Sequence, residues 1–211
     1  MLRLILCITL LNTHTLASSQ SVSQNVFTSI YVNNDWGFGS GLGSTIDYTN
    51  IYREYLPILL QTLGAITVTD IGSGDWQFSK LIDWSHFNYT GIDCVKHLVD
   101  ANNVLYNRPN IRFQHMDILV DVDKLAPVDV ILLKDVIQHW PVSDIKRILA
   151  VLVTKCKYLV VTNCAFQTDD RDTQLGGFRP LSYKMPPLSD YHPILLFTFH
   201  TKETALIRGS L

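Results

Sequence analysis

Short apolar runs alternate with amphipathic stretches along most of this chain. Five of the runs are rich in β-branched and aromatic residues and predict strands at 65–70, 89–93, 111–117, 128–134 and 157–163. The stretches between them predict helices at 76–84, 95–106 and 141–153, and a short helix or turn at 119–126. Strands that alternate with helices indicate β-α units around a parallel sheet buried on both faces.

The two ends of the chain show other patterns. Residues 18–44 are rich in Ser, Asn and Gly and predict a loop-like approach to a helix within 45–63, which Pro57 is expected to kink or to start late. Near the C-terminus, two strand-like runs flank "HTKE" and predict an antiparallel hairpin at the sheet edge. The predicted fold is therefore α/β: a Rossmann-like, doubly wound, mostly parallel seven-stranded sheet that ends in an antiparallel hairpin.

The composition suits one domain and gives little sign of a partner. With 211 residues, 47% of them apolar, the chain can bury a single core. The formal net charge of −2 provides no broad basic surface for nucleic acid. No segment approaches the ~20 consecutive apolar residues of a membrane span. The residues indicate neither a nucleic-acid nor a membrane partner, and they carry no signal for an oligomeric state.

The first residues have the layout of a secretory signal peptide. Arg3 precedes an apolar run at 4–11, and the small residues around Ala17 suit cleavage, so 1–17 is predicted to be a leader. An apolar extension of a cytosolic protein is the alternative. The remaining cysteines, Cys94, Cys156 and Cys164, have no C-x-x-C or metal-ligand spacing and do not suggest a disulfide scaffold. The location is therefore secretory if the leader functions and cytoplasmic otherwise, and no metal is expected.

A glycine-rich turn follows the first predicted strand in "TDIGSGDWQFSK" (69–80). Gly72 and Gly74 allow a ligand close to the backbone at a helix start. Asp93, 19 residues after Gly74, ends the next strand and is placed to accept hydrogen bonds from ribose hydroxyls. A dinucleotide fingerprint needs a third glycine, where this chain has Gln77, so NAD or FAD is disfavoured. An ordinary β-α turn and a surface Asp are the plain alternatives.

The sequence resembles class I S-adenosylmethionine (SAM)-dependent methyltransferases at several motifs. Asp70-Ile-Gly-Ser-Gly-Asp75 resembles their glycine motif, Asp93 their ribose-binding acid, and Asp117 the residue that contacts the adenine amino group. "LLKDVIQHW" (132–140) is similar to the motif that faces cofactor and substrate. The resemblance implies a methyltransferase domain over 45–211 and SAM as cofactor. The implied binding residues are Asp70, Gly72, Ser73, Gly74, Asp75, Trp76, Asp93, Asp117 and Asp135.

A narrower resemblance covers roughly residues 34–190. "GSGLGSTIDYTNIYREYL", "GSGDWQFSKLIDW", "KDVIQHWP" and "GGFRPL" together resemble a small group of class I methyltransferases without an evident substrate. Relatives of this kind occur beside sugar-modifying modules, so the resemblance implies a small-molecule or glycan-like acceptor. The chain departs from the pattern in Asn163-Cys164, where relatives have Asn-Asp, and in lacking an acid after "RPL". Either departure is expected to alter substrate choice or to reduce activity.

The candidate catalytic residues are Asp135 and His139. A hydroxyl or amine acceptor must lose a proton, and a histidine with an ordinary pKa of about 6.5 suits that task. Asp135 is a candidate to orient His139, to bind substrate or to cap the loop. The alternative is that Gln138, His139 and Trp140 only begin a helix that packs on the sheet.

Residues of the N-terminal segment 18–44 and of the helix after it are expected to form a lid. Trp36, Ser44, Tyr52 and Arg53 are candidates to cover the cofactor, and Arg53 is able to meet the SAM carboxylate. An ordinary arginine on a helix surface is the alternative for Arg53.

The long loop after the fifth strand is a second candidate to close the site. Arg179, in "GGFRP", is expected to hold an anionic group of the substrate or to pair with Asp169 or Asp170. Gln138 is expected on the substrate side.

Two other functions stay open at this point. A non-catalytic secreted protein that retains the fold is favoured by the leader, because SAM is scarce outside the cytosol. An NAD(P)-dependent oxidoreductase is the third hypothesis, and only a preference for NAD(P) over SAM would support it.

Overall fold

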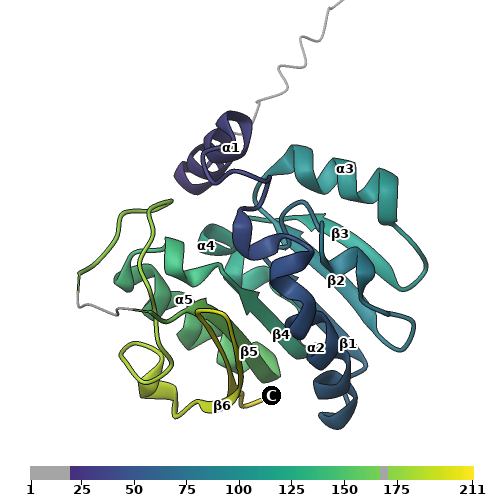
Figure 1. Ribbon diagram of the computed structural model, residues 1–211, viewed down its shortest axis with the longest axis vertical. Helices are drawn as coiled ribbons and strands as arrows, with labels where there is room; N and C mark the ends of the chain where they lie inside the picture. The colour runs from purple at the N-terminus through teal and green to yellow at the C-terminus, as the bar shows by residue number, and fades with distance from the viewer. Residues whose placement is uncertain (1–19, 167–170) are drawn as a thin grey trace, which may run out of the picture.

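A seven-stranded sheet forms the centre of the protein (Figure 1). The computed structural model describes residues 20–166 and 171–211. The strands, in chain order, are β1 (Thr67–Ile71), β2 (Asn88–Asp93), β3 (Ile111–His115), β4 (Val128–Lys134), β5 (Cys156–Cys164), β6 (Ile194–Phe199) and β7 (Lys202–Arg208). Their spatial order is β3-β2-β1-β4-β5-β7-β6, and all neighbours are parallel except β5–β7 and β6–β7. The predicted α/β fold, mostly parallel with a C-terminal hairpin, is confirmed.

Helices cover the sheet on both faces (Figure 1). Two helices, α2 (Asn50–Thr62) and α3 (Lys96–Tyr106), pack on one face, and α4 (Ile118–Asp121) and α5 (Val142–Lys155) pack on the other. The central strand β4 shows why: Val130 and Leu132 belong to one core, and Ile131 and Leu133 to the other. Successive side chains of a strand point to opposite faces, so a strand buried twice must be continuously apolar.

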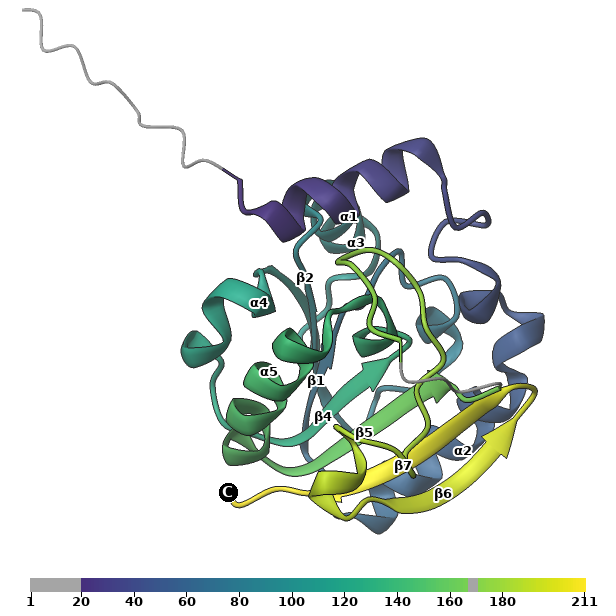
Figure 2. The same ribbon diagram turned by 90° about the vertical axis from the view of Figure 1, so that its left-hand side faces the viewer.

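The N-terminal segment differs from its prediction. Residues 18–44 are not simply loop-like, because α1 (Val22–Asn33) forms within them. Ser21 accepts a hydrogen bond from the Gln24 N–H, and the Gln24 side chain accepts one from the Ser21 N–H. This capping box satisfies two donors that a helix start leaves unpaired. Helix α1 lies across the end of the sheet at which the parallel strands terminate (Figure 2).

The helix predicted at 76–84 is wrong. Only a 3-10 turn, η3 (Ser79–Leu81), forms there. Trp76 has a positive φ of 55°, which no helix accommodates, and its buried indole donates to the Tyr89 hydroxyl at 2.9 Å. The side chain is thus committed to an aromatic cluster with Tyr89, Tyr106 and Phe113.

The helix expected within 45–63 starts late. Two 3-10 turns, η1 (Leu42–Ser44) and η2 (Asp47–Thr49), precede α2, and Pro57 lies inside α2. Three further 3-10 turns are η4 (Val122–Lys124), η5 (Ile137–His139) and η6 (Ser189–Tyr191).

The hairpin turn is shorter than "HTKE" suggests. Strand β6 ends at Phe199 and β7 begins at Lys202, so only His200 and Thr201 form the turn. Lys202 is therefore a strand residue, and it is buried.

Among the described residues, no helix is long and apolar enough to cross a membrane. The predicted leader, 1–17, lies outside the described residues.

Candidate functional site

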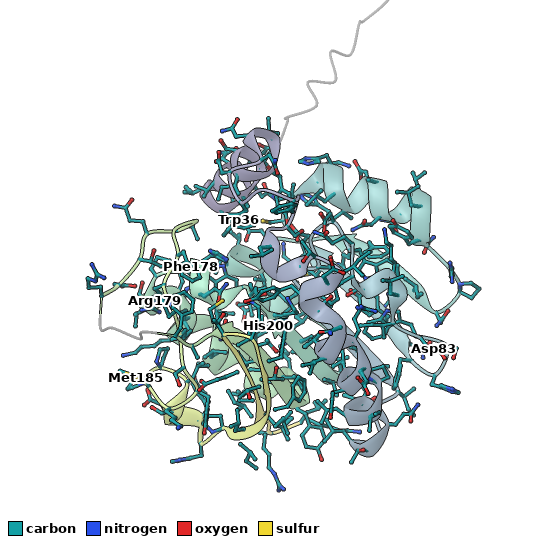
Figure 3. The ribbon with its side chains drawn as sticks, viewed as in Figure 1. Trp36, Asp83, Phe178, Arg179, Met185 and His200 are labelled. Carbon is teal, nitrogen blue, oxygen red and sulfur yellow. The ribbon has the colours of Figure 1, made fainter. Side chains whose placement is uncertain are left out.

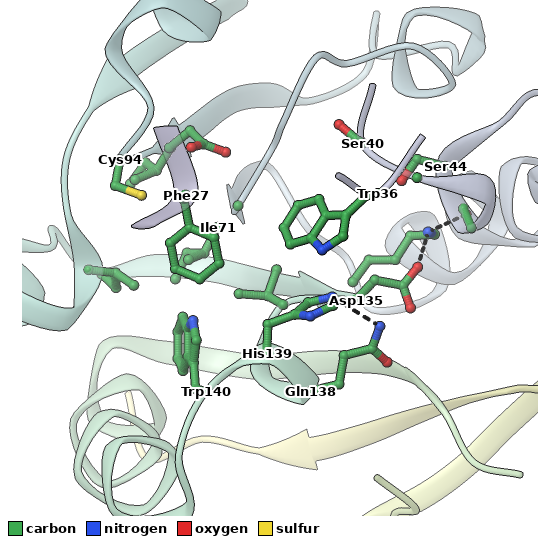
Figure 4. Close-up of a pocket in the computed structure, with 18 of the residues that line it drawn as sticks. Phe27, Trp36, Ser40, Ser44, Ile71, Cys94, Asp135, Gln138, His139 and Trp140 are labelled. Atoms are coloured by element: carbon green, nitrogen blue, oxygen red, sulfur yellow. Dashed lines mark hydrogen bonds and ion pairs between the residues drawn. The ribbon is translucent and has the colours of Figure 1, made fainter. Parts of the chain in front are cut away.

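A cavity of about 270 Å³ lies at the edge of the sheet where the parallel strands end (Figure 4). Its walls come from the residues that end or follow β1, β2, β3, β4 and β5, from the start of β7, and from the N-terminal segment. In open α/β sheets this edge is where ligands bind. The cavity is lined mostly by apolar groups, with three carboxylates and two lysines among them.

The glycine turn forms one side of the cavity. Gly72 has a φ of +72°, and a Cβ added there would lie 2.6 Å from Val136. Gly74 has a φ of +56°, and the Ser40 and Tyr31 hydroxyls occupy the space that a Cβ would need there. Both positions therefore need glycine, for backbone conformation and for close packing. Gly72 lines the cavity.

Asp93 stands at the end of β2 and lines the cavity. Its Oδ2 accepts the Gly74 N–H and its Oδ1 accepts the Val95 N–H, both at 2.9 Å. Burial raises the pKa of Asp93 against the effect of these donors. The glycine turn and the acid, 19 residues apart, are thus joined directly by a hydrogen bond.

Asp117 follows β3 and also lines the cavity. Its Oδ1 caps α4 by accepting the Leu119 N–H at 3.0 Å. Its Oδ2 accepts hydrogen bonds from the Ser21 and Ser23 hydroxyls. The start of α1 is therefore hydrogen-bonded to the residue for which the family resemblance implies contact with adenine.

Asp135 follows β4 with a positive φ of 59° and is held by two lysines. Lys134 Nζ lies 2.7 Å from Oδ2, and Lys202 Nζ lies 2.6 Å from Oδ1. Burial opposes ionisation, but the two cations outweigh it and keep the pKa of Asp135 below its usual range. Asp135 is therefore a carboxylate at neutral pH, and it does not contact His139 by a hydrogen bond in the structure.

His139 has a fixed ring orientation. Its Nδ1 lies 2.7 Å from the Gly177 carbonyl oxygen. A carbonyl only accepts, so Nδ1 carries the proton, and the unprotonated Nε2 accepts a long hydrogen bond from the Gln138 amide at 3.4 Å. Burial lowers the pKa of His139, which keeps the ring neutral near pH 7. The indole of Trp36 packs against the imidazole, with ring centroids 4.7 Å apart (Figure 4).

Gln138 supports this arrangement. Its Oε1 accepts the Cys164 N–H at 2.9 Å, which directs its Nε2 toward His139 Nε2 at 3.4 Å. The Arg179 N–H donates to the Gln138 carbonyl at 3.1 Å. The loop after β5 is thus joined to the 3-10 turn that carries His139.

Several predicted site residues do not line the cavity. Asp70 is buried and accepts a hydrogen bond from the Tyr89 hydroxyl at 2.7 Å. Asp75 accepts from the Ser40 N–H and hydroxyl, so it ties the N-terminal segment to the glycine turn. The others outside the lining are Ser73, Gly74, Trp76, Tyr52, Arg53 and Arg179.

The two predicted arginines have local partners. Arg53 donates to the Ile46 carbonyl at 3.1 Å. Arg179 is buried and lies 3.6 Å from Asp172. The partners expected from sequence, Asp169 and Asp170, lie outside the described residues.

The cavity also contains residues that the sequence did not single out. Lys134 and Lys202 are buried cations, and Phe27, Tyr31 and Phe178 are aromatic walls. Figure 3 shows Trp36 below α1 and Phe178 on the loop after β5. Lys134 precedes the singled-out Asp135 and could have been found from that position. The sequence pattern did not indicate a role for Lys202 in the cavity, because it predicted Lys202 to be a turn residue.

Comparison with known proteins identifies the fold. No protein-family model and no curated protein matches the chain. Among solved structures, human N-acetylserotonin methyltransferase in complex with SAM is 17% identical, with a TM-score of 0.66 over 90% of this chain and 61% of that chain. Magnesium protoporphyrin IX methyltransferase from Synechocystis PCC 6803 with bound SAM is 15% identical, with a TM-score of 0.57 over 92% and 99%.

A third similar structure is the bifunctional kinase-methyltransferase WbdD, 16% identical, with a TM-score of 0.59 over 76% of this chain. The chain spans 39% of that WbdD chain and 61% of the human enzyme. The likeness shows that this chain has the fold of class I SAM-dependent methyltransferases.

Proposed function

We propose that this chain is a SAM-dependent methyltransferase that acts on a hydroxyl or amine of a small-molecule or glycan-like acceptor. One observation supports it most: a single cavity brings together the glycine turn, Asp93, Asp117 and a neutral histidine whose Nε2 is unprotonated. The fold of the similar structures, two of which hold SAM, supports the same conclusion.

The carboxylates of the cavity fit a nucleoside. Each oxygen of Asp93 accepts one backbone N–H and retains a lone pair, so the two oxygens are able to accept both hydroxyls of a ribose. Asp117 Oδ1 accepts only the Leu119 N–H and retains a lone pair for an amino group. Ile92, Met116 and Ile118 supply apolar walls around these carboxylates.

When bound, SAM supplies an electrophilic methyl group on a sulfonium. His139 accepts the acceptor's proton at Nε2, where the acceptor's hydroxyl or amine takes the place of the Gln138 amide. Its Nδ1 keeps its own proton, which is hydrogen-bonded to the Gly177 carbonyl. Trp36 and Phe178 flank the imidazole, with ring centroids 4.7 and 5.9 Å away, and limit the access of water to it. Alignment of the acceptor by these walls supplies the positioning on which methyl transfer depends.

Methyl-labelled SAM is the direct test. The protein is incubated with labelled SAM and fractionated extract, and the label is located by chromatography and mass spectrometry. We expect label in one class of small molecule or glycan. His139→Gln is the matched variant, and it is expected to bind S-adenosylhomocysteine (SAH) as wild type does while transferring far less label. Binding of SAH without transfer to any fraction would contradict the enzymatic proposal and favour a non-catalytic protein.

A further inference from the structure

The two lysines of the cavity differ in the partners of their ammonium groups. Lys134 donates to the Gly43 carbonyl at 2.9 Å and to Asp135 at 2.7 Å, and its ammonium lies 4.9 Å from the centroid of the Phe78 ring. Asp70 also acts on Lys134 through its charge. Lys134 therefore has two carboxylates near it, and its two hydrogen bonds join the N-terminal segment to the end of β4.

Lys202 is a protonated cation whose second acceptor is weak. Burial opposes its charge, but Asp135 outweighs burial and raises the pKa of Lys202 above its usual value. Its ammonium also lies 5.8 Å from the centroid of the Tyr48 ring. It shares Asp135 with Lys134, and its other hydrogen-bond neighbour is the thiol of Cys164, at 3.3 Å. A thiol is a weak acceptor and carries no charge in its protonated form. An ammonium has three donors, so Lys202 retains one that Asp135 and Cys164 do not use. Lys202 is thus a buried cation, 3% exposed, that lines the cavity and has a donor available to a ligand.

Lys202 lies on the acceptor side of the cavity. It starts β7, which pairs with β5, whereas Asp93 and Asp117 follow β2 and β3 across the sheet. Its charge acts on His139, and Cys164, its neighbour, donates its N–H to Gln138. The ammonium is therefore near the imidazole that would accept the proton and away from the carboxylates that would hold a nucleoside.

We propose that Lys202 binds an anionic group, a carboxylate or a phosphate, on the methyl acceptor. The proposal rests on the proposed function and narrows its substrate class to acidic acceptors. Such a group completes the coordination of the ammonium by a charge-assisted hydrogen bond. The rings of Trp36, His139 and Phe178 lie at the same side and suit a flat or ring-shaped body next to the anionic group.

A matched pair of probes tests this. The probes are 4-hydroxybenzoate and 4-hydroxybenzamide, which share the ring and the hydroxyl but differ in charge. Each is titrated calorimetrically into SAH-saturated protein, as wild type and as Lys202→Met, Lys202→Arg and Lys184→Met. Lys184 is an exposed lysine outside the cavity, so its variant controls for the lost charge.

Wild type and Lys184→Met are expected to bind the carboxylate at least about tenfold more tightly than the amide. Lys202→Met is expected to lose this preference with unchanged SAH affinity, and Lys202→Arg to keep it. Thermal unfolding checks that each variant is folded, and Lys202→Gln replaces Lys202→Met if the latter is not.

Three results would overturn the proposal: no preference for the carboxylate in wild type, a preference that survives in Lys202→Met, or a loss of SAH affinity in Lys202→Met. The last result would assign the ammonium to the cofactor's carboxylate instead of the acceptor's. Titrations without SAH separate this proposal from the proposed function. If wild type fails to bind SAH but prefers the carboxylate through Lys202, the anion site stands and the methyltransferase proposal fails.

Discussion

Asp70→Asn is expected to stabilise the protein at neutral pH, although Asp70 opens the glycine motif. The carboxyl is buried beneath the Tyr89 hydroxyl and does not line the cavity. Burial raises its pKa from 3.8 to about 6, against the hydrogen bond from Tyr89 and the charge of Lys134. An asparagine keeps an oxygen for the Tyr89 hydroxyl without the cost of a buried charge.

The size of the effect follows from the pKa shift. Because the folded pKa is raised, the favourable contribution of Asp70 is fully present below about pH 4 and is lost as pH rises through about 6. A shift of about two pKa units corresponds to about 3 kcal/mol, at 1.36 kcal/mol per unit. The attraction between Asp70 and Lys134 is already included in this shift, so about 3 kcal/mol is the net figure.

Urea unfolding of wild type and Asp70→Asn at pH 4 through 8 measures this. The difference between the two free energies of unfolding is expected to grow in favour of the variant by up to about 3 kcal/mol between pH 4 and pH 7. Other titrating groups are common to both proteins and cancel in the difference. A difference that does not change with pH, or a variant less stable at pH 8 than at pH 4 relative to wild type, would refute the reasoning.

Three further predictions concern the cavity and its cover. His139→Gln is expected to lower the rate of methyl transfer about 10²–10⁴-fold. Because burial lowers the pKa of His139, the wild-type rate is expected to fall only below pH 6.5, and a pH–rate profile of both proteins checks the two expectations. Gly72→Ala is expected to lower the free energy of unfolding, measured in urea, by about 1–2 kcal/mol for its positive φ and by about 1–3 kcal/mol for crowding Val136. Adding Val136→Ala to this variant should restore part of the loss due to crowding. Ser23→Ala removes a donor to Asp117 and should speed amide exchange in α1, which unchanged exchange would contradict.

The sheet could be predicted from sequence because its strands are buried on both faces. Continuous apolar runs such as 128–134 are typical of strands in a parallel sheet that is covered on both faces. Asp93 and Asp117, the latter implied only by the resemblance, line one cavity because the carboxyl ends of parallel strands meet at one edge.

Other features depended on contacts that the local sequence does not show. Helix α1 has little amphipathic pattern and relies on its cap and on packing over the cavity. The resemblance implies that Trp76 binds the cofactor, whereas the structure places its indole in the aromatic cluster. The sequence also did not show whether Asp70 points into the cavity or into the core, because successive side chains of a strand point in opposite directions. Lys202 was missed because a two-residue turn extends β7 to include it.

The central claim is that Asp93 and its surroundings bind SAM, and calorimetry with SAH tests it most directly. Wild type is expected to bind SAH. Asp93→Asn is expected to bind SAH at least about tenfold more weakly, because an amide offers one acceptor oxygen instead of two. Asp70→Asn, which changes a carboxylate outside the cavity, serves as the control and is expected to bind within about threefold of wild type. Absence of SAH binding in wild type, or equal affinity in wild type and Asp93→Asn, would contradict the account.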